Sequence, residues 1–222
     1  MDENRQTYRQ KKRHPYRLNR RQRAYLPVKR AADLILSALS ILLLALPMGI
    51  LAALILLDSG RPVLFRQKRV GKNGTYFEIL KFRTMRTDTP QDVPTHLLDD
   101  PDRYITKVGR VLRKTSLDEL PQIFNIFKGD MSFIGPRPAL WNQYDLIAER
   151  EKYGVNALVP GLTGWAQTHG RDELKIREKA RLDRYYLRHL GPAIDISCFF
   201  LTLETVITKD GVKEGRQIST GS

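Results

Sequence analysis

The longest apolar stretch of the chain lies near its N-terminus. Residues 34–57, "LILSALSILLLALPMGILAALILL", contain no charged side chain and are bounded by Asp33 and Asp58. At about 1.5 Å per residue, a straight helix of this length would be roughly 36 Å long. Because the hydrocarbon core of a bilayer is about 30 Å thick, the stretch is long enough to cross a membrane.

Pro47 lies near the middle of this stretch. It cannot donate a hydrogen bond to the carbonyl four residues earlier, so we expect a kink there. Basic residues stand on both sides, a Lys-Arg pair before the stretch and several within 61–72 after it, and the positive-inside rule therefore places both ends in the cytoplasm. The favoured prediction is a re-entrant helix, 29–58, that breaks near Pro47 and returns to the same membrane face. A kinked helix that crosses once is the alternative.

Alternating apolar and polar positions after the membrane segment predict a β-hairpin. Residues 63–70 and 75–85 flank an Asn-Gly dipeptide, which is typical of tight turns. Period-two alternation places Lys81 and Arg83 on one face beyond two apolar residues, as expected for a strand that runs from the core into a polar cleft. Charges exposed near a strand end are an equal alternative.

Helical periodicity and helix-end residues account for most of the remaining chain. The expected helices begin near Thr106 and cover 121–129, 172–190 and 193–208, while 87–103 and 159–171 are expected to be loops. The pattern predicts a mostly helical α+β fold. A re-entrant membrane helix hairpin would precede a globular domain, 59–210, with a small β-hairpin and amphipathic helices at the membrane interface.

Positive charge is concentrated at the N-terminus. Residues 1–30 hold eleven Lys and Arg against two acids, which is +9 of the chain's net +14. The basic arm, 1–28, has too few apolar residues to fold, so we expect disorder there and a flexible tail at 211–222. Its partner is nucleic acid or an anionic membrane surface, and the adjacent membrane helix favours membrane lipids. No nucleic acid is expected.

Two acids, Asp118 and Glu119, stand side by side in "TSLDELPQIFNIFKGDMSFIGPRP", residues 115–138. Ser116 and Glu119 match a helix capping box, and capping alone explains acids in a first helical turn. Chemistry on a phosphate is the alternative. Adjacent residues on a helix point about 100° apart, which suits two different roles, a nucleophile and a metal ligand. Arg113 and Arg137 would keep the acids ionised, and arginine binds phosphate in a bidentate manner.

Several common site types are absent from the sequence. A single cysteine, Cys198, and four scattered histidines give no zinc-ligand spacing and suit a reducing compartment. There is no glycine-rich phosphate loop or dinucleotide fingerprint. Two classes other than an enzyme remain as alternatives, a membrane anchor that recruits polyanions and a membrane-associated nucleic-acid binder.

The chain from Lys29 to Thr208 resembles the bacterial sugar transferase family, the monotopic polyprenyl-phosphate phosphoglycosyl transferases. The matching motifs are "KRAADLILS", "LLDSGRPVLFRQKRVGKNG", "FEILKFRTM", "TKVGRVLRKTSLDELPQIFNIFKGDMSFIGPRP", "VPGLTGWAQTHGR" and "LDRYYLRHLGPAIDI". The resemblance implies an enzyme of the bacterial cytoplasmic membrane whose catalytic domain faces the cytoplasm. Its donor would be a UDP-sugar and its acceptor undecaprenyl phosphate, for the first membrane step of polysaccharide or glycoconjugate assembly.

The resemblance also implies roles for individual residues. Asp118 matches a nucleophile that releases UMP and carries the phosphosugar until polyprenyl phosphate attacks it, in a ping-pong reaction. Glu119 matches a carboxylate that binds Mg²⁺, and Pro47 matches the break in a re-entrant helix. The remaining matches are substrate-binding or phosphate-binding positions: Lys81, Arg83, Arg113, Arg137, Arg171, Asp183 and Asp195.

Overall fold

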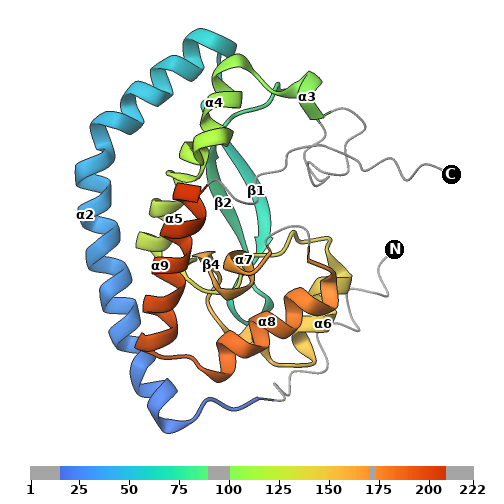
Figure 1. The fold of residues 1–222 in the computed structure, drawn as a ribbon. Coiled ribbons are helices and arrows are strands. Elements are labelled where there is room, and N and C mark those ends of the chain that lie inside the picture. Colours follow the sequence, from blue (N-terminus) through green and yellow to red (C-terminus); the bar gives the residue numbers. More distant parts are fainter. Residues whose placement is uncertain (1–15, 90–100, 171–173, 209–222) are drawn as a thin grey trace, which may run out of the picture.

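The computed structural model describes residues 16–89, 101–170 and 174–208. Most of these residues are helical, with short strands, so the predicted α+β class is confirmed (Figure 1). In chain order the described elements are α2 (Arg20–Ser59), β1 (Leu64–Val70), η1 (Lys72–Gly74), β2 (Tyr76–Phe82), α3 (Pro101–Tyr104), α4 (Lys107–Thr115), η3 (Leu117–Glu119), α5 (Gln122–Lys128), β3 (Ser132–Ile134), α6 (Tyr144–Glu151), η4 (Val155–Ala157), β4 (Gly161–Thr163), α7 (Trp165–Thr168), α8 (Ile176–Arg188) and α9 (Pro192–Thr208).

Helix α2 runs along one side of the molecule as a single bowed helix (Figure 1). It is uninterrupted through Pro27 and Pro47, and its two ends lie at opposite ends of the structure. The structure therefore does not show the predicted hairpin that reverses at Pro47. A proline removes only one helical hydrogen bond, which permits a bend. Contacts at both ends of α2 hold these two ends apart.

The first turn of α2 begins at Arg20, inside the predicted basic arm. Asn19 and Gln22 form a capping box, in which each side chain accepts a hydrogen bond of 2.9 Å from the other residue's amide. The buried Gln22 side chain also donates to the Leu187 carbonyl of α8 at 2.8 Å. The prediction of disorder was thus wrong for 20–28, because α8 holds this turn in place. The rest of the predicted arm up to residue 15 and the predicted tail, 211–222, lie outside the described residues.

Both ends of α2 pack against the globular part of the structure. Near its start, Arg30 donates to the Ile126 and Phe127 carbonyls at the end of α5, at 2.7 and 2.8 Å. Near its end, the buried Ile55 packs in a cluster with residues of β2 and α4, and Asp58 accepts a hydrogen bond from the Val108 amide. Both ends of the helix are therefore attached to the same body.

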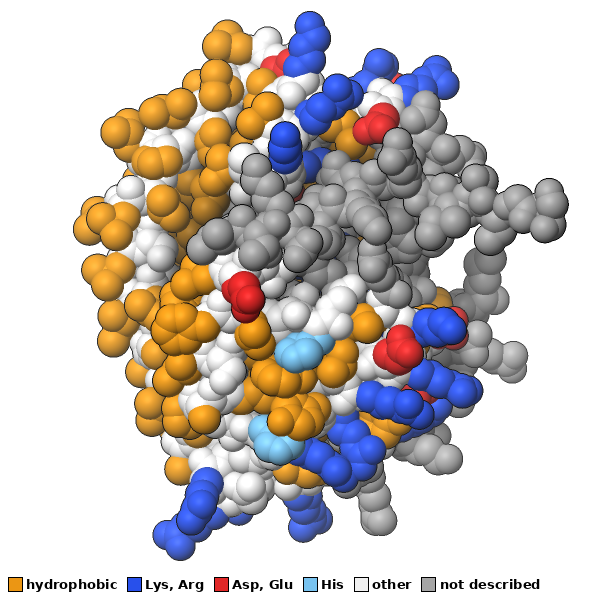
Figure 2. All heavy atoms as spheres, in the orientation of Figure 1, with side chains coloured by type: hydrophobic (Ala, Val, Ile, Leu, Met, Phe, Trp, Pro, Cys, Tyr) orange, Lys and Arg blue, Asp and Glu red, His pale blue; other side chains and the backbone are white. Residues whose placement is uncertain are grey.

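The middle of α2 faces outward and is apolar. Leu42, Leu43 and Leu46 are each 75% exposed, and apolar side chains cover this side of the molecule in Figure 2. Exposed aromatic residues of α9, Phe199 and Phe200, add to the apolar surface. Among the described residues, α2 is the helix that is long and apolar enough to cross a membrane by length and composition. A surface of this size and composition suits lipid better than water.

The structure contains two small sheets where the sequence predicted one. Strands β1 and β2 form the expected antiparallel hairpin, from Leu64 opposite Phe82 to Val70 opposite Tyr76. Strands β3 and β4 form a second, parallel pair. The predicted loop 159–171 was therefore wrong in part, since it contains β4 and α7. Three-residue strands carry too little periodicity for detection, and this pair depends on close backbone contact between Gly135 and Gly161.

The four predicted helices after the hairpin are present, although α8 is shorter than the predicted 172–190, of which 172–173 lie outside the described residues. The predicted loop 87–103 was wrong at its end, where α3 begins at Pro101. Helix α4 begins after Thr106, whose hydroxyl accepts a hydrogen bond from the Gly109 amide. Helix α5 ends at Gly129, which adopts a left-handed conformation with φ of 100°. Helices α8 and α9 contribute to the largest buried cluster together with β3 and η4. Together these elements hold the segment 115–138 between α2 and the hairpin (Figure 1).

Candidate active site

Asp118 and Glu119 lie in a tight connection between α4 and α5. Ser116 ends α4 in a left-handed conformation with φ of 57°, and η3 follows directly. No side chain caps η3, and Glu119 points to other partners, so the capping-box alternative is wrong. The cause is Ser116, whose left-handed conformation closes the preceding helix and cannot serve as the extended first cap of a new one. The connection leaves Asp118 buried, with 8% exposure.

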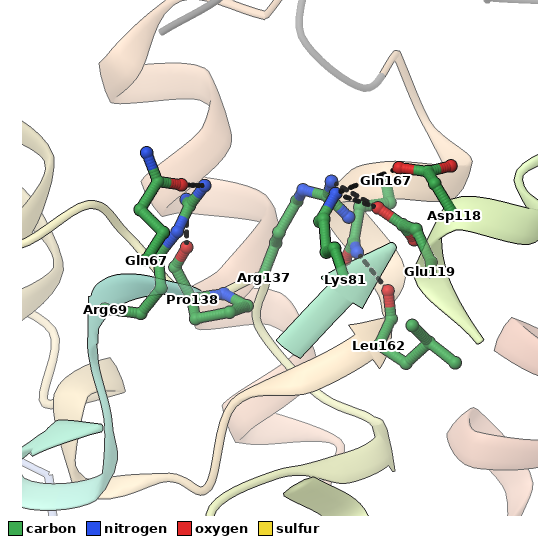
Figure 3. Close-up of polar contacts among 9 residues, drawn as sticks. All are labelled: Gln67, Arg69, Lys81, Asp118, Glu119, Arg137, Pro138, Leu162 and Gln167. Carbon is green, nitrogen blue, oxygen red and sulfur yellow. Dashed lines mark hydrogen bonds and ion pairs between the residues drawn. The ribbon is translucent and has the colours of Figure 1, made fainter. Parts of the chain in front are cut away.

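Glu119 is held by two cations that come from distant parts of the chain. Lys81 Nζ lies 2.7 Å from Glu119 Oε1, and an Arg137 terminal nitrogen lies 2.9 Å from the same oxygen. Lys81 Nζ is also 3.8 Å from Asp118 Oδ2, so it faces both carboxylates (Figure 3). The sequence prediction that Lys81 points from β2 into a polar site is confirmed.

The two neighbouring carboxyl groups have opposite pKa shifts. Burial raises the pKa of Asp118, the negative charge of Glu119 adds to this, and the attraction of Lys81, Arg113 and Arg137 only partly opposes it. Burial would also raise the pKa of Glu119, but the charges and hydrogen bonds of Lys81 and Arg137 outweigh it and hold this pKa well below its usual range. Glu119 therefore stays ionised, whereas Asp118 has the higher proton affinity of the two.

Four other predicted site residues are not seen in this ion-pair cluster. Three of them have partners elsewhere in the structure, and one lies outside the described residues. Arg83 is buried and donates to the Ser59 and Gly60 carbonyls at the C-terminal end of α2, at 2.7 and 2.8 Å. Asp183 is buried in an ion pair with Arg150. The remaining two are Asp195, which accepts hydrogen bonds from Tyr25, Lys29 and Tyr186, and Arg171, which lies outside the described residues.

Three polar residues that the sequence analysis did not single out also shape the site. Asn125 of α5 accepts from the Leu80 amide and donates to the Glu78 carbonyl, which attaches α5 to the strand that carries Lys81. Gln167 of α7 donates to the Leu162 carbonyl beside the cluster (Figure 3). The third is Arg150, which donates hydrogen bonds to the Asp183 carboxylate and to the Arg137 carbonyl. Nothing in the local sequence distinguishes these residues from ordinary surface polar residues.

Two adjacent carboxylates could hold a magnesium ion only together with oxygen atoms of a substrate. No group of three or more His, Cys, Asp or Glu that could hold a metal occurs in the described part of the chain. A metal held by protein side chains alone is therefore not supported there. Mg²⁺, however, is commonly bound through one or two carboxylates together with substrate phosphates. Both ion pairs of Glu119 use Oε1, so they do not engage Oε2.

The fold and site together define a class of protein. It has a long exposed apolar helix, a small α+β body and a buried carboxylate pair surrounded by cations, an arrangement suited to phosphate chemistry near a membrane. Residues 24–209 match the model of the family described as bacterial sugar transferase. The chain belongs to this family, which confirms the resemblance found in its motifs.

Curated proteins that resemble the chain agree with this family. The chain is 38% identical over 167 residues to the uncharacterized sugar transferase EpsL of Bacillus subtilis (strain 168), covering 75% of this chain and 81% of that protein. It is 39% identical over 196 residues to a UDP-N-acetylgalactosamine-undecaprenyl-phosphate N-acetylgalactosaminephosphotransferase of Aeromonas hydrophila. It is 40% identical over 189 residues to an undecaprenyl-phosphate glucose phosphotransferase of Komagataeibacter xylinus.

The length of these relatives differs from that of the chain. The match covers 85% of this chain but 46% of the Aeromonas protein, and 81% of this chain but 36% of the Komagataeibacter protein. The chain thus spans less than half of these two relatives.

Proposed function

We propose that the chain transfers a sugar 1-phosphate from a UDP-sugar to undecaprenyl phosphate and releases UMP. The observation that carries this proposal is the buried Asp118 beside Glu119, with Lys81 and Arg137 in contact with the pair. Family membership and the activities for which the Aeromonas and Komagataeibacter relatives are named support the same reaction.

In the first half-reaction, Asp118 attacks the sugar-proximal phosphorus of the donor. A bond forms between a carboxylate oxygen and phosphorus, the bond to the bridging oxygen breaks, and UMP leaves with the electron pair. Only ionised Asp118 can attack, and Lys81, 3.8 Å away, favours this form against the effect of burial. Lys81, Arg113 and Arg137 would also stabilise the negative charge that develops on the phosphate oxygens.

In the second half-reaction, a phosphate oxygen of undecaprenyl phosphate attacks the same phosphorus. The bond to Asp118 breaks, the carboxylate is regenerated, and the product is the undecaprenyl diphosphate sugar. The same cations serve both steps because the same phosphorus reacts twice. One site can therefore perform both steps in turn, which is the ping-pong mechanism expected from the family resemblance.

Mg²⁺ is part of the proposal. Glu119 would hold it through Oε2 together with donor phosphate oxygens, and the ion would stabilise negative charge on the diphosphate. We expect excess EDTA to abolish UMP release and added Mg²⁺ to restore it. The control is the same assay with EDTA that has been saturated with Mg²⁺ beforehand. Full turnover in excess chelator would contradict the metal role of Glu119.

The membrane arrangement that we propose is monotopic, with the catalytic domain on the cytoplasmic face. Both ends of α2 are attached to the same globular body, through Arg30 near the start and Asp58 near the end. A helix that crossed the bilayer would carry its two ends to opposite sides, away from that body. The bowed α2 would therefore insert its exposed apolar middle into the bilayer from the cytoplasmic side and return to the same side. Helix α9 would lie at the membrane–water interface.

The test is UMP release from UDP-sugars in the absence of acceptor. We expect stoichiometric UMP and a phosphosugar adduct on the protein by intact mass spectrometry after brief exposure to the donor. The UDP derivatives of N-acetylgalactosamine, glucose and galactose are the first to use, because relatives are named for these sugars. A pure membrane anchor or a nucleic-acid binder would give neither UMP nor adduct with any of these donors.

A further inference from the structure

The Pro136-Arg137-Pro138 turn is attached to three different elements. Each of its three consecutive carbonyl groups accepts a hydrogen bond, at 3.0, 2.9 and 3.1 Å in chain order. The respective donors are the Gly161 amide of β4, the Arg150 guanidinium of α6 and the Arg69 guanidinium of β1. All three carbonyl groups of the turn are therefore held by hydrogen bonds.

Arg150 is itself held by a buried carboxylate. Its Nε and a terminal nitrogen lie 2.8 and 2.7 Å from Asp183 Oδ2. The two side chains are 5% and 2% exposed, so the pair is almost fully removed from water. The other terminal nitrogen of Arg150 makes the contact with the Arg137 carbonyl. The guanidinium of Arg150, a residue of α6, thus connects Asp183 of α8 to the turn.

This connection needs an arginine. A planar guanidinium can donate to a carboxylate along one edge and to a carbonyl from its remaining nitrogen at the same time. A lysine at this position would keep the charge, but its single nitrogen could not reproduce both contacts in the same geometry. Removal of Asp183 would leave a buried, unpaired cation, which is strongly unfavourable.

We propose that Arg150 and Asp183 are positioning residues for the reaction. Asp183 fixes Arg150, Arg150 fixes the Arg137 carbonyl, and the backbone of Arg137 then directs its side chain to Glu119. This inference rests on the proposed function of the Asp118–Glu119 site. It gives Asp183, a motif residue that lies away from that site, a mechanical connection to it.

The backbone of Arg137 is restricted by its two neighbouring prolines as well as by this hydrogen bond. Pro136 and Pro138 restrict their own φ angles, and the residue before a proline is restricted to extended conformations. The side chain of Arg137, in contrast, is 39% exposed, so packing alone does not immobilise it. A small rotation at its carbonyl would be amplified along the long side chain and would move the guanidinium away from Glu119 and from a bound diphosphate.

The experiment is a comparison of Arg150→Lys in two backgrounds, the native protein and Arg137→Ala. Single-turnover UMP release is the kinetic readout, because slow variants can be followed for hours. In the native background we expect a loss of about 10- to 100-fold, the size expected when a reactive group is slightly misplaced. In the Arg137→Ala background we expect little further loss, because the residue that the connection positions is already gone.

Two further variants make the result specific. Arg184→Lys is the matched control, since Arg184 follows Asp183 on α8 but contacts the ring of Tyr153, just after α6, 4.9 Å from the ring centroid. Arg184→Lys should keep native rates. Asp183→Asn retains an oxygen that can accept from Arg150 and should lose less activity than Arg150→Lys. It also serves as the test variant if Arg150→Lys does not fold.

A second readout does not depend on activity. Hydrogen exchange of 135–140, followed by mass spectrometry, should become faster in Arg150→Lys and stay native in Arg184→Lys. Equal loss of UMP release in both backgrounds, or unchanged exchange in this segment, would overturn the positioning role. If the native protein releases no UMP from any donor, the proposed function fails, while the exchange result still decides whether Arg150 fixes the turn.

Discussion

At the scale of single residues, the two neighbouring acids are distinguished by their surroundings and not by their type. Glu119 contacts Lys81 and Arg137 directly, whereas Asp118 is buried with Lys81 at 3.8 Å. The sequence could predict that adjacent carboxylates suit different roles, because they diverge on a helix. It could not predict which acid would be held by the cations, since Lys81 and Arg137 are 38 and 18 residues from Glu119 in the chain.

We predict that Asp118→Asn abolishes both the phosphosugar adduct and turnover, by more than about a thousandfold, while the fold survives. Asn keeps the shape of Asp but has no charge with which to attack phosphorus. Intact mass spectrometry after exposure to the UDP-sugar is the measurement, and circular dichroism checks the fold. An adduct that persists in this variant, or that maps to another residue, would reject Asp118 as the nucleophile.

The same variant has a predicted effect on stability. The pKa of Asp118 is raised above its ordinary value of 3.8 in the folded state. Below that value both the folded and the unfolded states are protonated, and the group has no effect. As the pH rises, the unfolded state ionises first, so ionisation costs the folded state stability. Asp118→Asn should therefore unfold at a higher temperature than the native protein at neutral pH, and this difference should vanish in acid.

Lys81 should control the pH dependence of the first half-reaction. In the proposed mechanism UMP release needs ionised Asp118, so its rate should fall as the pH drops through the raised pKa of Asp118. Lys81 lowers that pKa, and Lys81→Met should move the acidic limb of the pH–rate profile to higher pH. The control is Arg66→Met, because Arg66 forms an exposed ion pair with Glu78 on the same hairpin. An acidic limb that does not move would show that Lys81 does not act on Asp118.

At the scale of elements, the sequence patterns correctly predicted the helices and strands whose formation depends on local interactions. The hairpin, α4, α5, α8 and α9 have clear periodicity or end residues, and they form where the sequence predicts them. The extension of α2 to Arg20 and the pairing of β3 with β4 depend on contacts far away in the chain, such as that of Gln22 with the Leu187 carbonyl. The sequence motifs also grouped Arg83, Asp183 and Asp195 with the site, although each is placed by contacts between elements.

The pairing of β3 with β4 predicts a specific sensitivity to small substitutions. A Cβ added to Gly161 would lie 2.1 Å from the Gly135 nitrogen, so Gly161→Ala must separate the strands. We expect a cost of roughly 1–3 kcal/mol and slower UMP release, because the Gly161 amide also holds the Pro136 carbonyl. Gly49→Ala is the control, since a Cβ there meets nothing within 4 Å. Thermal unfolding of both variants in detergent is the measurement, and native stability in Gly161→Ala would contradict the close contact.

At the scale of the whole molecule, the attachment of both ends of α2 to one body predicts the topology. Cysteines introduced at the exposed positions Arg17 and Arg61 should both resist a membrane-impermeant maleimide in intact spheroplasts and react after lysis. The native Cys198 is fully buried and should give little background. Leu43→Cys, in the exposed apolar middle, should stay unlabelled in both conditions because it faces lipid. Labelling of either end in intact spheroplasts would mean that α2 crosses the membrane.

Strand β2 and the residue after it connect the carboxylate pair to the end of the apolar helix, and in the proposed function this connection would set the distance of the reaction from the bilayer. Lys81 contacts the carboxylates, and Arg83, two residues further on, binds the final carbonyls of the apolar helix. Two residues of strand extend only about 7 Å. In the proposed reaction and membrane arrangement, the reacting phosphorus would therefore lie a short, fixed distance from the level at which the helix leaves the hydrocarbon. An acceptor whose phosphate lies at the level of the lipid headgroups could reach this phosphorus while its isoprenoid tail stays in the membrane. No domain would have to move to bring acceptor and phosphorus together.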